Sequence, residues 1–67
     1  MREGTVKWFH PSSGYGFIRP KDGKEDVFVF YPSIDTKGPK TLSSGQSVKF
    51  ESSEGIKGHT ATRVVFS

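Results

Sequence analysis

The chain has 67 residues, no cysteine, and ten lysines and arginines against seven aspartates and glutamates, which gives a formal net charge of +3. This length allows one domain over residues 1–67. The lack of cysteine excludes disulfides and thiolate metal sites, and no apolar run approaches the roughly 20 residues of a membrane-spanning helix.

Short strands separated by glycine and proline are the regular elements that the sequence predicts. No segment keeps apolar residues at the helical period over three turns. An Asp22-Gly23 turn is expected between the second and third strands, one 3₁₀ turn over 31–35, and a polar loop over 36–45. The predicted strands are, in chain order, 3–9, 15–19, 26–30, 46–51 and 60–66.

Five short strands in so short a chain predict an all-β protein whose sheet closes, fully or partly, into a barrel. An open sheet would leave unpaired edges and would expose one large face to water. Such a barrel has a small interior. Nine residues are aromatic, whereas only ten are valine, isoleucine or leucine. Some aromatic rings are therefore expected at the surface, while Phe50 and Phe66 are expected in the core.

The second and third predicted strands separate aromatic from aliphatic side chains, because successive strand residues point to opposite faces. The ordinary preference for buried rings would put the aromatic set inside. Those four rings would overfill a five-stranded interior, so we expect the aliphatic set inside and the rings outside. The aromatic set is Tyr15, Phe17, Phe28 and Phe30, and the aliphatic set is Ile18, Val27 and Val29.

An exposed aromatic cluster generally marks a binding surface. Rings beside cations suit single-stranded nucleic acid, since every base offers a face for stacking. The net charge of +3 supports an anionic partner only modestly. Two alternatives remain open at this point: a barrel that docks a partner polypeptide through its rings, and a barrel that binds oligosaccharides.

Other chemistry is not supported by the residues. The glycines at 14 and 16 are not a dinucleotide fingerprint, because Arg19 fills the third glycine position and no helix follows. Asp22, Glu25 and Asp26 are typical of a solvated hairpin end, since ligands at the spacing of a calcium loop are missing. Two histidines without cysteine do not suggest a zinc site. With no converging acid, base and nucleophile, we expect neither an enzyme nor a bound cofactor or metal.

Several segments resemble the bacterial cold-shock protein family, in order and over essentially the whole chain. Segments 14–18 (GYGFI) and 26–29 (DVFV) resemble its two ribonucleoprotein motifs, and 4–9 (GTVKWF) resembles its first strand. Residues 40–42, 45–46 and 54–55 match the later pattern. The resemblance implies a five-stranded antiparallel oligonucleotide/oligosaccharide-binding (OB) barrel. It also implies a protein that binds single-stranded RNA and DNA, with pyrimidine-rich stretches favoured.

The same resemblance implies a role in the cold-shock response. The expected protein is an RNA chaperone that melts secondary structure without ATP and so modulates transcription and translation. We expect it to act as a monomer in the cytoplasm, since the chain start lacks the apolar stretch of a secretory signal and the missing cysteines fit a reducing compartment.

The resemblance also implies the residues of the nucleic-acid site. Lys7 and Lys57 match basic positions expected to meet phosphates, and Asp26 matches a polar group near a base edge. Strict alternation puts Trp8 on the face of Val6, so an exposed Trp8 above a buried Val6 requires a bulge or strong twist. The implied stacking residues are Trp8, Tyr15, Phe17, Phe28 and Tyr31, and Phe9, His10 and Phe30 are expected to belong to the same patch.

Five positions depart from the family's usual pattern. Ser13 stands where lysine is usual and removes a cation, and Phe30 replaces a common histidine, so it can stack but offers no charge. Pro39 occupies a position where an aromatic ring often stacks on a base. His10 and His59 replace the more usual asparagine and proline. We expect the fold and the general activity to hold, with an altered affinity or base preference.

Overall fold

The computed structural model describes residues 1–55 and 58–66, which form five strands and one short 3₁₀ helix. The 3₁₀ helix η1 (Tyr31–Ser33) follows the third strand directly. In these residues no helix is long and apolar enough to cross a membrane. The strands are β1 (Arg2–His10), β2 (Tyr15–Pro20), β3 (Val27–Phe30), β4 (Ser47–Gly55) and β5 (Gly58–Phe66).

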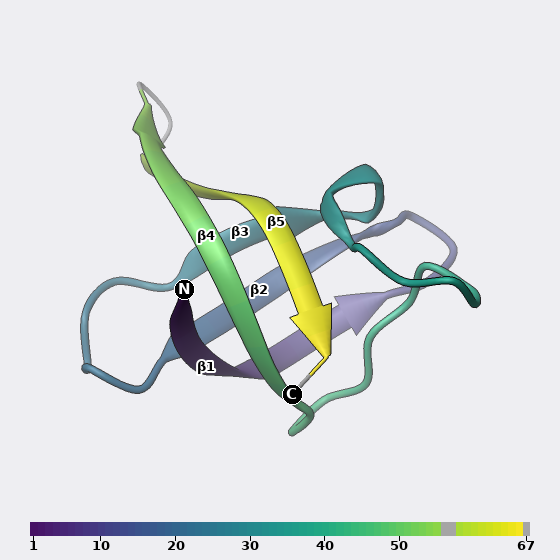
Figure 1. Ribbon diagram of the computed structural model, residues 1–67, viewed down its shortest axis with the longest axis horizontal. Coiled ribbons are helices and arrows are strands. Elements are labelled where there is room, and N and C mark those ends of the chain that lie inside the picture. Colours follow the sequence, from purple (N-terminus) through teal and green to yellow (C-terminus); the bar gives the residue numbers. More distant parts are fainter. Residues whose placement is uncertain (56–57, 67) are drawn as a thin grey trace.

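The strands close into a barrel in the order β1-β2-β3-β5-β4, so the predicted five-stranded barrel is confirmed. In Figure 1, β4 and β5 cross in front of the layer that β1, β2 and β3 form. Four of the five neighbouring pairs are antiparallel, as expected. The fifth, β3 with β5, is parallel and pairs Phe28 with Thr60. This pairing closes the barrel and brings the start of β5 beside β3.

The strand bounds differ most from the prediction in β4 and β5, which were expected over 46–51 and 60–66. Their ladder continues through Ser53↔Thr60 and Glu54↔His59 to Gly55↔Gly58. This stretch of β4 has no apolar residue to signal a strand, and backbone pairing alone extends it. The two strands therefore form a long ribbon that reaches beyond the apolar interior.

The Asp-Gly turn lies where the sequence placed it, but it is part of a longer connection over residues 21–26. The Gly23 amide donates to the Pro20 carbonyl over 3.2 Å, and Gly23 has a φ of 77°. The Asp22 Oδ1 accepts a hydrogen bond from the Lys24 amide over 3.0 Å. The turn thus ends β2, and three more residues lead to β3. The predicted two-residue hairpin turn is replaced by this wider loop.

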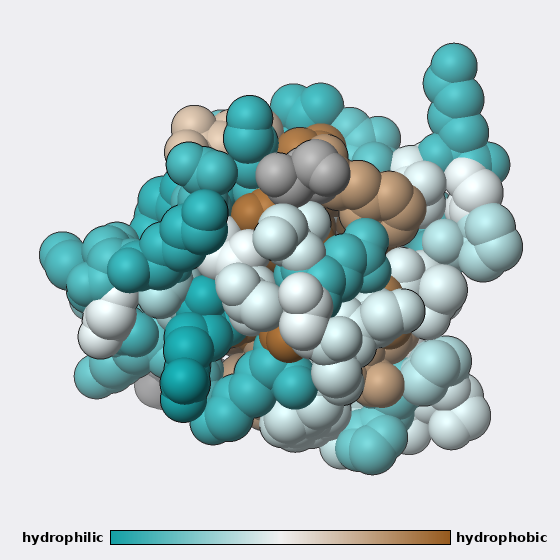
Figure 2. All heavy atoms as spheres, turned by 90° about the horizontal axis from the view of Figure 1, so that it is seen from below, coloured by the Kyte–Doolittle hydropathy of each residue, from teal (hydrophilic) through white to brown (hydrophobic). Residues whose placement is uncertain are grey.

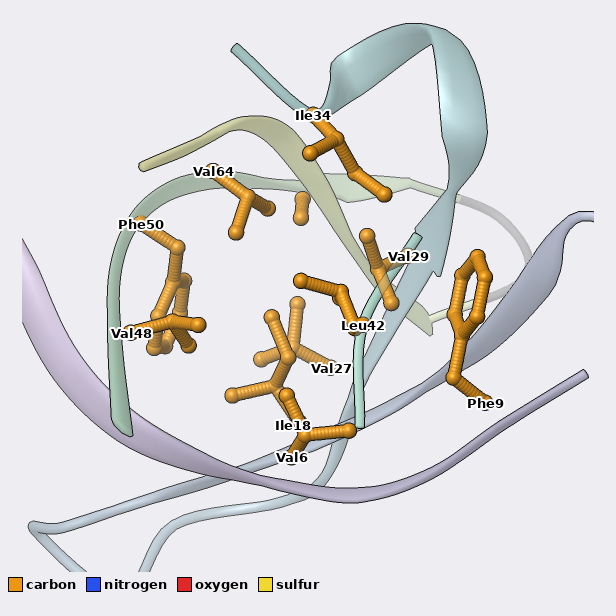
Figure 3. Close-up of a cluster of buried hydrophobic side chains, with 11 residues drawn as sticks. Val6, Phe9, Ile18, Val27, Val29, Ile34, Leu42, Val48, Phe50 and Val64 are labelled. Carbon is orange, nitrogen blue, oxygen red and sulfur yellow. The ribbon is translucent and has the colours of Figure 1, made fainter. Parts of the chain in front are cut away.

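The side chains buried in the barrel confirm the predicted alternation of aliphatic and aromatic residues in β2 and β3. Ile18, Val27 and Val29 are each 0% exposed, and Figure 3 shows them inside the barrel with the other buried side chains. Among the residues that the structure describes, the core consists of Val6, Phe9, Ile18, Val27, Val29, Ile34, Leu42, Val48, Phe50, Ala61 and Val64. Leu42 comes from the loop that was expected to be polar, so a connection between strands helps to fill the core.

Of the two rings assigned to the core, Phe50 is fully buried, but Phe66 is 45% exposed. The prediction for Phe66 was therefore wrong. Val64, two residues earlier in β5, is 0% exposed and fills the inner position. Phe66 is the last residue of β5, and the apolar interior that covers Val64 does not extend far enough to enclose a ring there.

The expected bulge in β1 is present. Val6 pairs with Ile18 and Trp8 pairs with Phe17, so one residue, Lys7, is left between two consecutive pairs. Val6 consequently stays in the core at 1% exposure, while the ring of Trp8 lies half-buried on the outer face. A bulge changes which face the following residues take. The bulge therefore allows β1 to place Val6 in the core and Trp8 on the outer face.

Candidate functional site

An aromatic face covers the outer side of β1, β2 and β3. Cross-strand pairing of Trp8 with Phe17 and of Phe17 with Phe28 puts these side chains in one row. The ring centroids of Trp8 and Phe17 are 5.3 Å apart and those of Phe17 and Phe28 are 5.7 Å apart, both edge to face. Edge-to-face contacts hold the rings together and leave ring faces toward solvent. We define the aromatic face as Trp8, His10, Tyr15, Phe17, Phe28, Phe30 and Tyr31.

Tyr15 and His10 extend this row along the β1–β2 hairpin. The ring of Tyr15 stacks on that of Phe28 at 5.9 Å with an interplanar angle of 26°, and its edge meets Trp8 at 5.6 Å. His10 is exposed and lies 4.7 Å from the Trp8 ring. Four rings of the face are therefore half-buried among one another, with an imidazole at one end.

Phe30 and Tyr31 form the more exposed end of the aromatic face. They are 43% and 47% exposed, with centroids 5.0 Å apart. The Tyr31 amide donates to the Gly14 carbonyl over 2.7 Å, and Gly14 has a φ of 79°. A Cβ atom on Gly14 would stand 2.8 Å from Tyr31 Cδ1. Glycine at this position thus permits both the turn after β1 and the close approach of the tyrosine ring.

Gly16 has a comparable role beneath the aromatic face. A Cβ atom there would clash with the Trp8 carbonyl oxygen and would lie 2.8 Å from Phe9 Cα. The backbones of β1 and β2 are therefore in close contact just past the bulge. The close approach of β2 to β1 beneath the aromatic face depends on the absence of a side chain at this position.

Hydrophobic side chains do reach the surface of the barrel. Figure 2 shows one face of the molecule, on which hydrophobic atoms come to the surface in several places between pale and hydrophilic ones. Large exposed rings in a small protein form surface that folding alone does not require. The exposed large hydrophobic residues are Met1, Phe30, Tyr31 and Phe66.

Lys7 and Asp26 pair with each other at the border of the aromatic face. The Lys7 Nζ donates to the Asp26 Oδ2 over 2.9 Å, and the side chains are 46% and 32% exposed. The bulge directs Lys7 outward beside Trp8, and Asp26 immediately precedes β3. Lys7, which was predicted to contact phosphate, thus forms a partly exposed ion pair with Asp26, which was predicted to contact a base edge. In this position they offer one donor and one acceptor together.

A cavity of about 520 Å³ continues from this ion pair past two rings of the aromatic face. It lies where the loop before β3 meets the start of β5, which the parallel β3–β5 pairing brings together. Several of its residues carry no sequence signal of a site, because they are distant along the chain. The lining residues are Phe17, Glu25, Asp26, Phe28, Gly58, His59 and Thr60.

One of the predicted site residues that the structure describes, Phe9, does not join the aromatic face. Phe9 is 9% exposed and belongs to the core cluster, at whose edge it appears in Figure 3. Alternation resumes after the bulge, so Trp8 and His10 point outward and Phe9 between them points inward. Lys57 lies outside the described residues. The other predicted residues are brought together on one side of the barrel.

Comparisons with known proteins identify relatives over nearly the full chain. The family model "'Cold-shock' DNA-binding domain" matches residues 2–67. Cold shock-like protein CspE of Buchnera aphidicola (subsp. Acyrthosiphon pisum) is 54% identical over 94% of this chain and 91% of that protein. CspE of Escherichia coli is 52% identical with the same coverage. Cold shock-like protein CspD of Escherichia coli is 48% identical over 97% of this chain and 88% of that protein.

A solved structure supports the fold independently. The structure described as drosophila Unr CSD456 superimposes with a TM-score of 0.77 at 19% identity, over 98% of this chain and 26% of that one. The present chain thus spans about a quarter of that longer chain, and the likeness concerns the fold alone. Together with the family match and the closed barrel, these relatives show that the chain belongs to the cold-shock domain family and has its OB-barrel fold.

Proposed function

We propose that this protein binds single-stranded RNA and DNA by stacking successive bases on the aromatic face. Membership in the cold-shock family supports nucleic-acid binding. The observation that carries the stacking mechanism is the row of outer rings from Trp8 through Phe17 to Phe28, continued by Phe30 and Tyr31. Base stacking on an aromatic side chain contributes roughly 1–3 kcal/mol per base and tolerates any sequence.

In this proposal, cationic side chains contribute less to the affinity for single strands than the aromatic rings do. Lys7 already has Asp26 as a partner, so its ammonium group adds little uncompensated charge to the aromatic face. The affinity for single strands should therefore fall gently with salt, at a log–log slope near −0.7 for each phosphate neutralised. We place Lys7 and Lys57 at phosphates and Asp26 at a base edge. Because stacking tolerates any base, we expect the protein to select only modestly among sequences, in favour of pyrimidine-rich stretches.

A protein of this kind would act as an RNA chaperone by mass action. A ligand that binds only one state of an equilibrium shifts that equilibrium toward the bound state. Binding unpaired strands therefore melts RNA secondary structure without ATP, and through it modulates transcription and translation. We place this activity in the cytoplasm during the cold-shock response, with the protein acting as a monomer of one domain.

Fluorescence of the single tryptophan, Trp8, tests the binding mode. Titration with a single-stranded oligothymidylate at low salt should quench the emission to saturation, because a base stacks against the indole. The same sequence presented as a duplex should quench far less, since its bases are already stacked and paired. Absence of quenching by the single strand, or equal quenching by the duplex, would contradict the proposal.

Chaperone action needs a separate measurement. An RNA hairpin that carries a fluorophore and a quencher at its ends should open when the protein is added without ATP. The melting temperature of the hairpin should fall progressively with protein concentration, as mass action requires. A protein that binds oligothymidylate but leaves the hairpin closed would retain the binding function and lose the chaperone role.

A further inference from the structure

His59 lies at the rim of the cavity beside two carboxylates from different parts of the fold. Its Nε2 is 3.7 Å from Glu25 Oε2, in the loop before β3, and 3.7 Å from Glu54 Oε2, on β4. The β4–β5 ladder pairs Glu54 directly with His59. The side chain of His59 is 29% exposed, whereas those of Glu25 and Glu54 are 82% and 77% exposed. One imidazole nitrogen is thus shared by two solvated acidic groups.

The charge of this cluster depends on the proton of His59. Asp26 lines the same cavity, but its carboxylate is compensated by Lys7. With a neutral imidazole, Glu25, which lines the cavity together with two rings of the aromatic face, and Glu54, which contacts His59 from β4, place two negative charges at this rim. A protonated imidazole reduces this to one. A phosphate backbone that runs across those rings meets less repulsion in the protonated state, and the effect weakens with salt.

Building on the proposed function, we infer that His59 makes the binding of single strands proton-linked. Coupling between two ligands is reciprocal, so if protonation favours binding, binding favours protonation. The bound strand adds negative charge near His59 and stabilises the imidazolium. Affinity therefore rises as the pH falls through the range where histidine changes charge, and this gain is lost as the pH rises again.

His10 is the one other histidine in the chain, and it competes as an explanation for any pH dependence. It is exposed and belongs to the aromatic face, 4.7 Å from the Trp8 ring and 5.9 Å from the Tyr15 ring. Protonation of His10 would also bring a cation toward phosphate. The two histidines differ in their neighbours, since His10 lies among rings and His59 between carboxylates. A matched pair of variants separates them.

The test measures affinity across pH with an end-labelled oligothymidylate, followed by anisotropy. Thymine has no group that titrates over this range, and anisotropy of the label does not depend on the emission of Trp8. From about pH 8 to about pH 5.5, wild-type affinity should rise about threefold or more, the scale of removing one partly screened charge. His59→Gln should abolish most of this rise, whereas His10→Gln should retain it.

Two further measurements exclude a merely structural effect of the substitution. Calorimetry in buffers of different ionisation enthalpy should show that binding near pH 6.5, about the middle of the histidine range, takes up protons in wild type and fewer in His59→Gln. Glu25→Gln and Glu54→Gln should each raise affinity near pH 8, by about twofold, because each removes one repulsive charge.

The outcomes distinguish this inference from the proposed function. Wild type that fails to bind oligothymidylate at every pH would overturn the proposed function itself. Wild type that binds with no change across pH would overturn the proton linkage alone. The linkage would equally be overturned if His59→Gln kept the wild-type pH slope, or if His10→Gln removed it.

Discussion

The strands β1–β3 and the strands β4–β5 bury the same kind of inner face but expose different outer faces. Val6, Ile18 and Val27 fill the interior from the first group, and Val48 and Val64 fill it from the second. The outer side of β1–β3 carries the aromatic face. The exposed residues of β4–β5 are mostly polar or charged, namely Ser47, Lys49, Glu51, Ser53, Glu54, Thr62 and Arg63, while Phe66 is exposed at the end of β5.

This difference between the outer faces separates the side chains that the fold requires from those that the proposed nucleic-acid ligand would contact. Water must be excluded from the barrel interior everywhere, so both groups of strands turn apolar side chains inward, although bulges interrupt the alternation in β1 and in the β4–β5 ladder. The stability of the fold does not require apolar side chains on the outer face. On β4–β5 it is an ordinary solvated surface, where Arg63 donates to Asp35 over 2.8 and 3.0 Å. On β1–β3 several outer positions hold rings, which the proposed stacking of bases would explain.

The largest effect is expected from a matched pair of phenylalanines in the β4–β5 group. Phe50 is 0% exposed and Phe66 is 45% exposed. Phe50→Ala should lower the free energy of unfolding by about 3–5 kcal/mol, because it leaves a cavity in the core. Phe66→Ala should lower it by less than about 1 kcal/mol, as at other surface sites. Urea denaturation measures both. Equal losses would contradict the burial of Phe50 and the exposure of Phe66.

The second effect concerns binding and compares outer positions of the two groups. Phe28→Ala should weaken the binding of single-stranded oligothymidylate by about 5- to 100-fold, since stacking contributes roughly 1–3 kcal/mol per base. Lys49→Ala, on the outer face of β4, should weaken it by less than about twofold, the effect of at most one distant cation. Titrations at fixed salt give both values. Similar losses for the two variants would mean that charge, and not stacking, dominates.

The smallest effect is expected at Asp22, in the loop that follows β2. The hydrogen bond from the Lys24 amide, aided by the nearby Arg2 guanidinium, holds the pKa of Asp22 below its ordinary value of 3.8. A lowered pKa in the folded state adds stability above the ordinary value, and this stability is lost as the pH falls through the folded-state pKa.

Two substitutions at Asp22 separate the hydrogen bond from the charge. Asp22→Ala should lower the melting temperature slightly at neutral pH and leave it unchanged at strongly acidic pH. Asp22→Asn should lower it less than Asp22→Ala, because its amide oxygen can still accept from Lys24. Thermal melts across the acidic range provide the measurement. A larger effect at low pH than at neutral pH would mean that the carboxylate does not stabilise the folded protein.

Much of the fold was predictable because it rests on local alternation. The burial of Ile18, Val27 and Val29 followed from a period of two, and the bulge followed from the demand that Val6 and Trp8 take opposite faces. The predictions of burial were wrong at positions where alternation along a strand no longer decides which side chains are buried. Phe66 looks like a core ring by alternation with Val64, yet the interior does not reach it. Leu42, alone in a polar loop, carries no periodic signal but is 4% exposed.

The amino-acid sequence by itself determined the strands, the inner aliphatic face and the outer rings, since each depends on residues that are near neighbours in the chain. Only the tertiary structure decided which charges meet. Lys7 pairs with Asp26 because the register of β1, β2 and β3 aligns the bulge in β1 with the start of β3. His59 contacts Glu25 because barrel closure sets the start of β5 beside β3 and the loop that precedes it. Such contacts depend on strand order and register, which local periodicity does not encode.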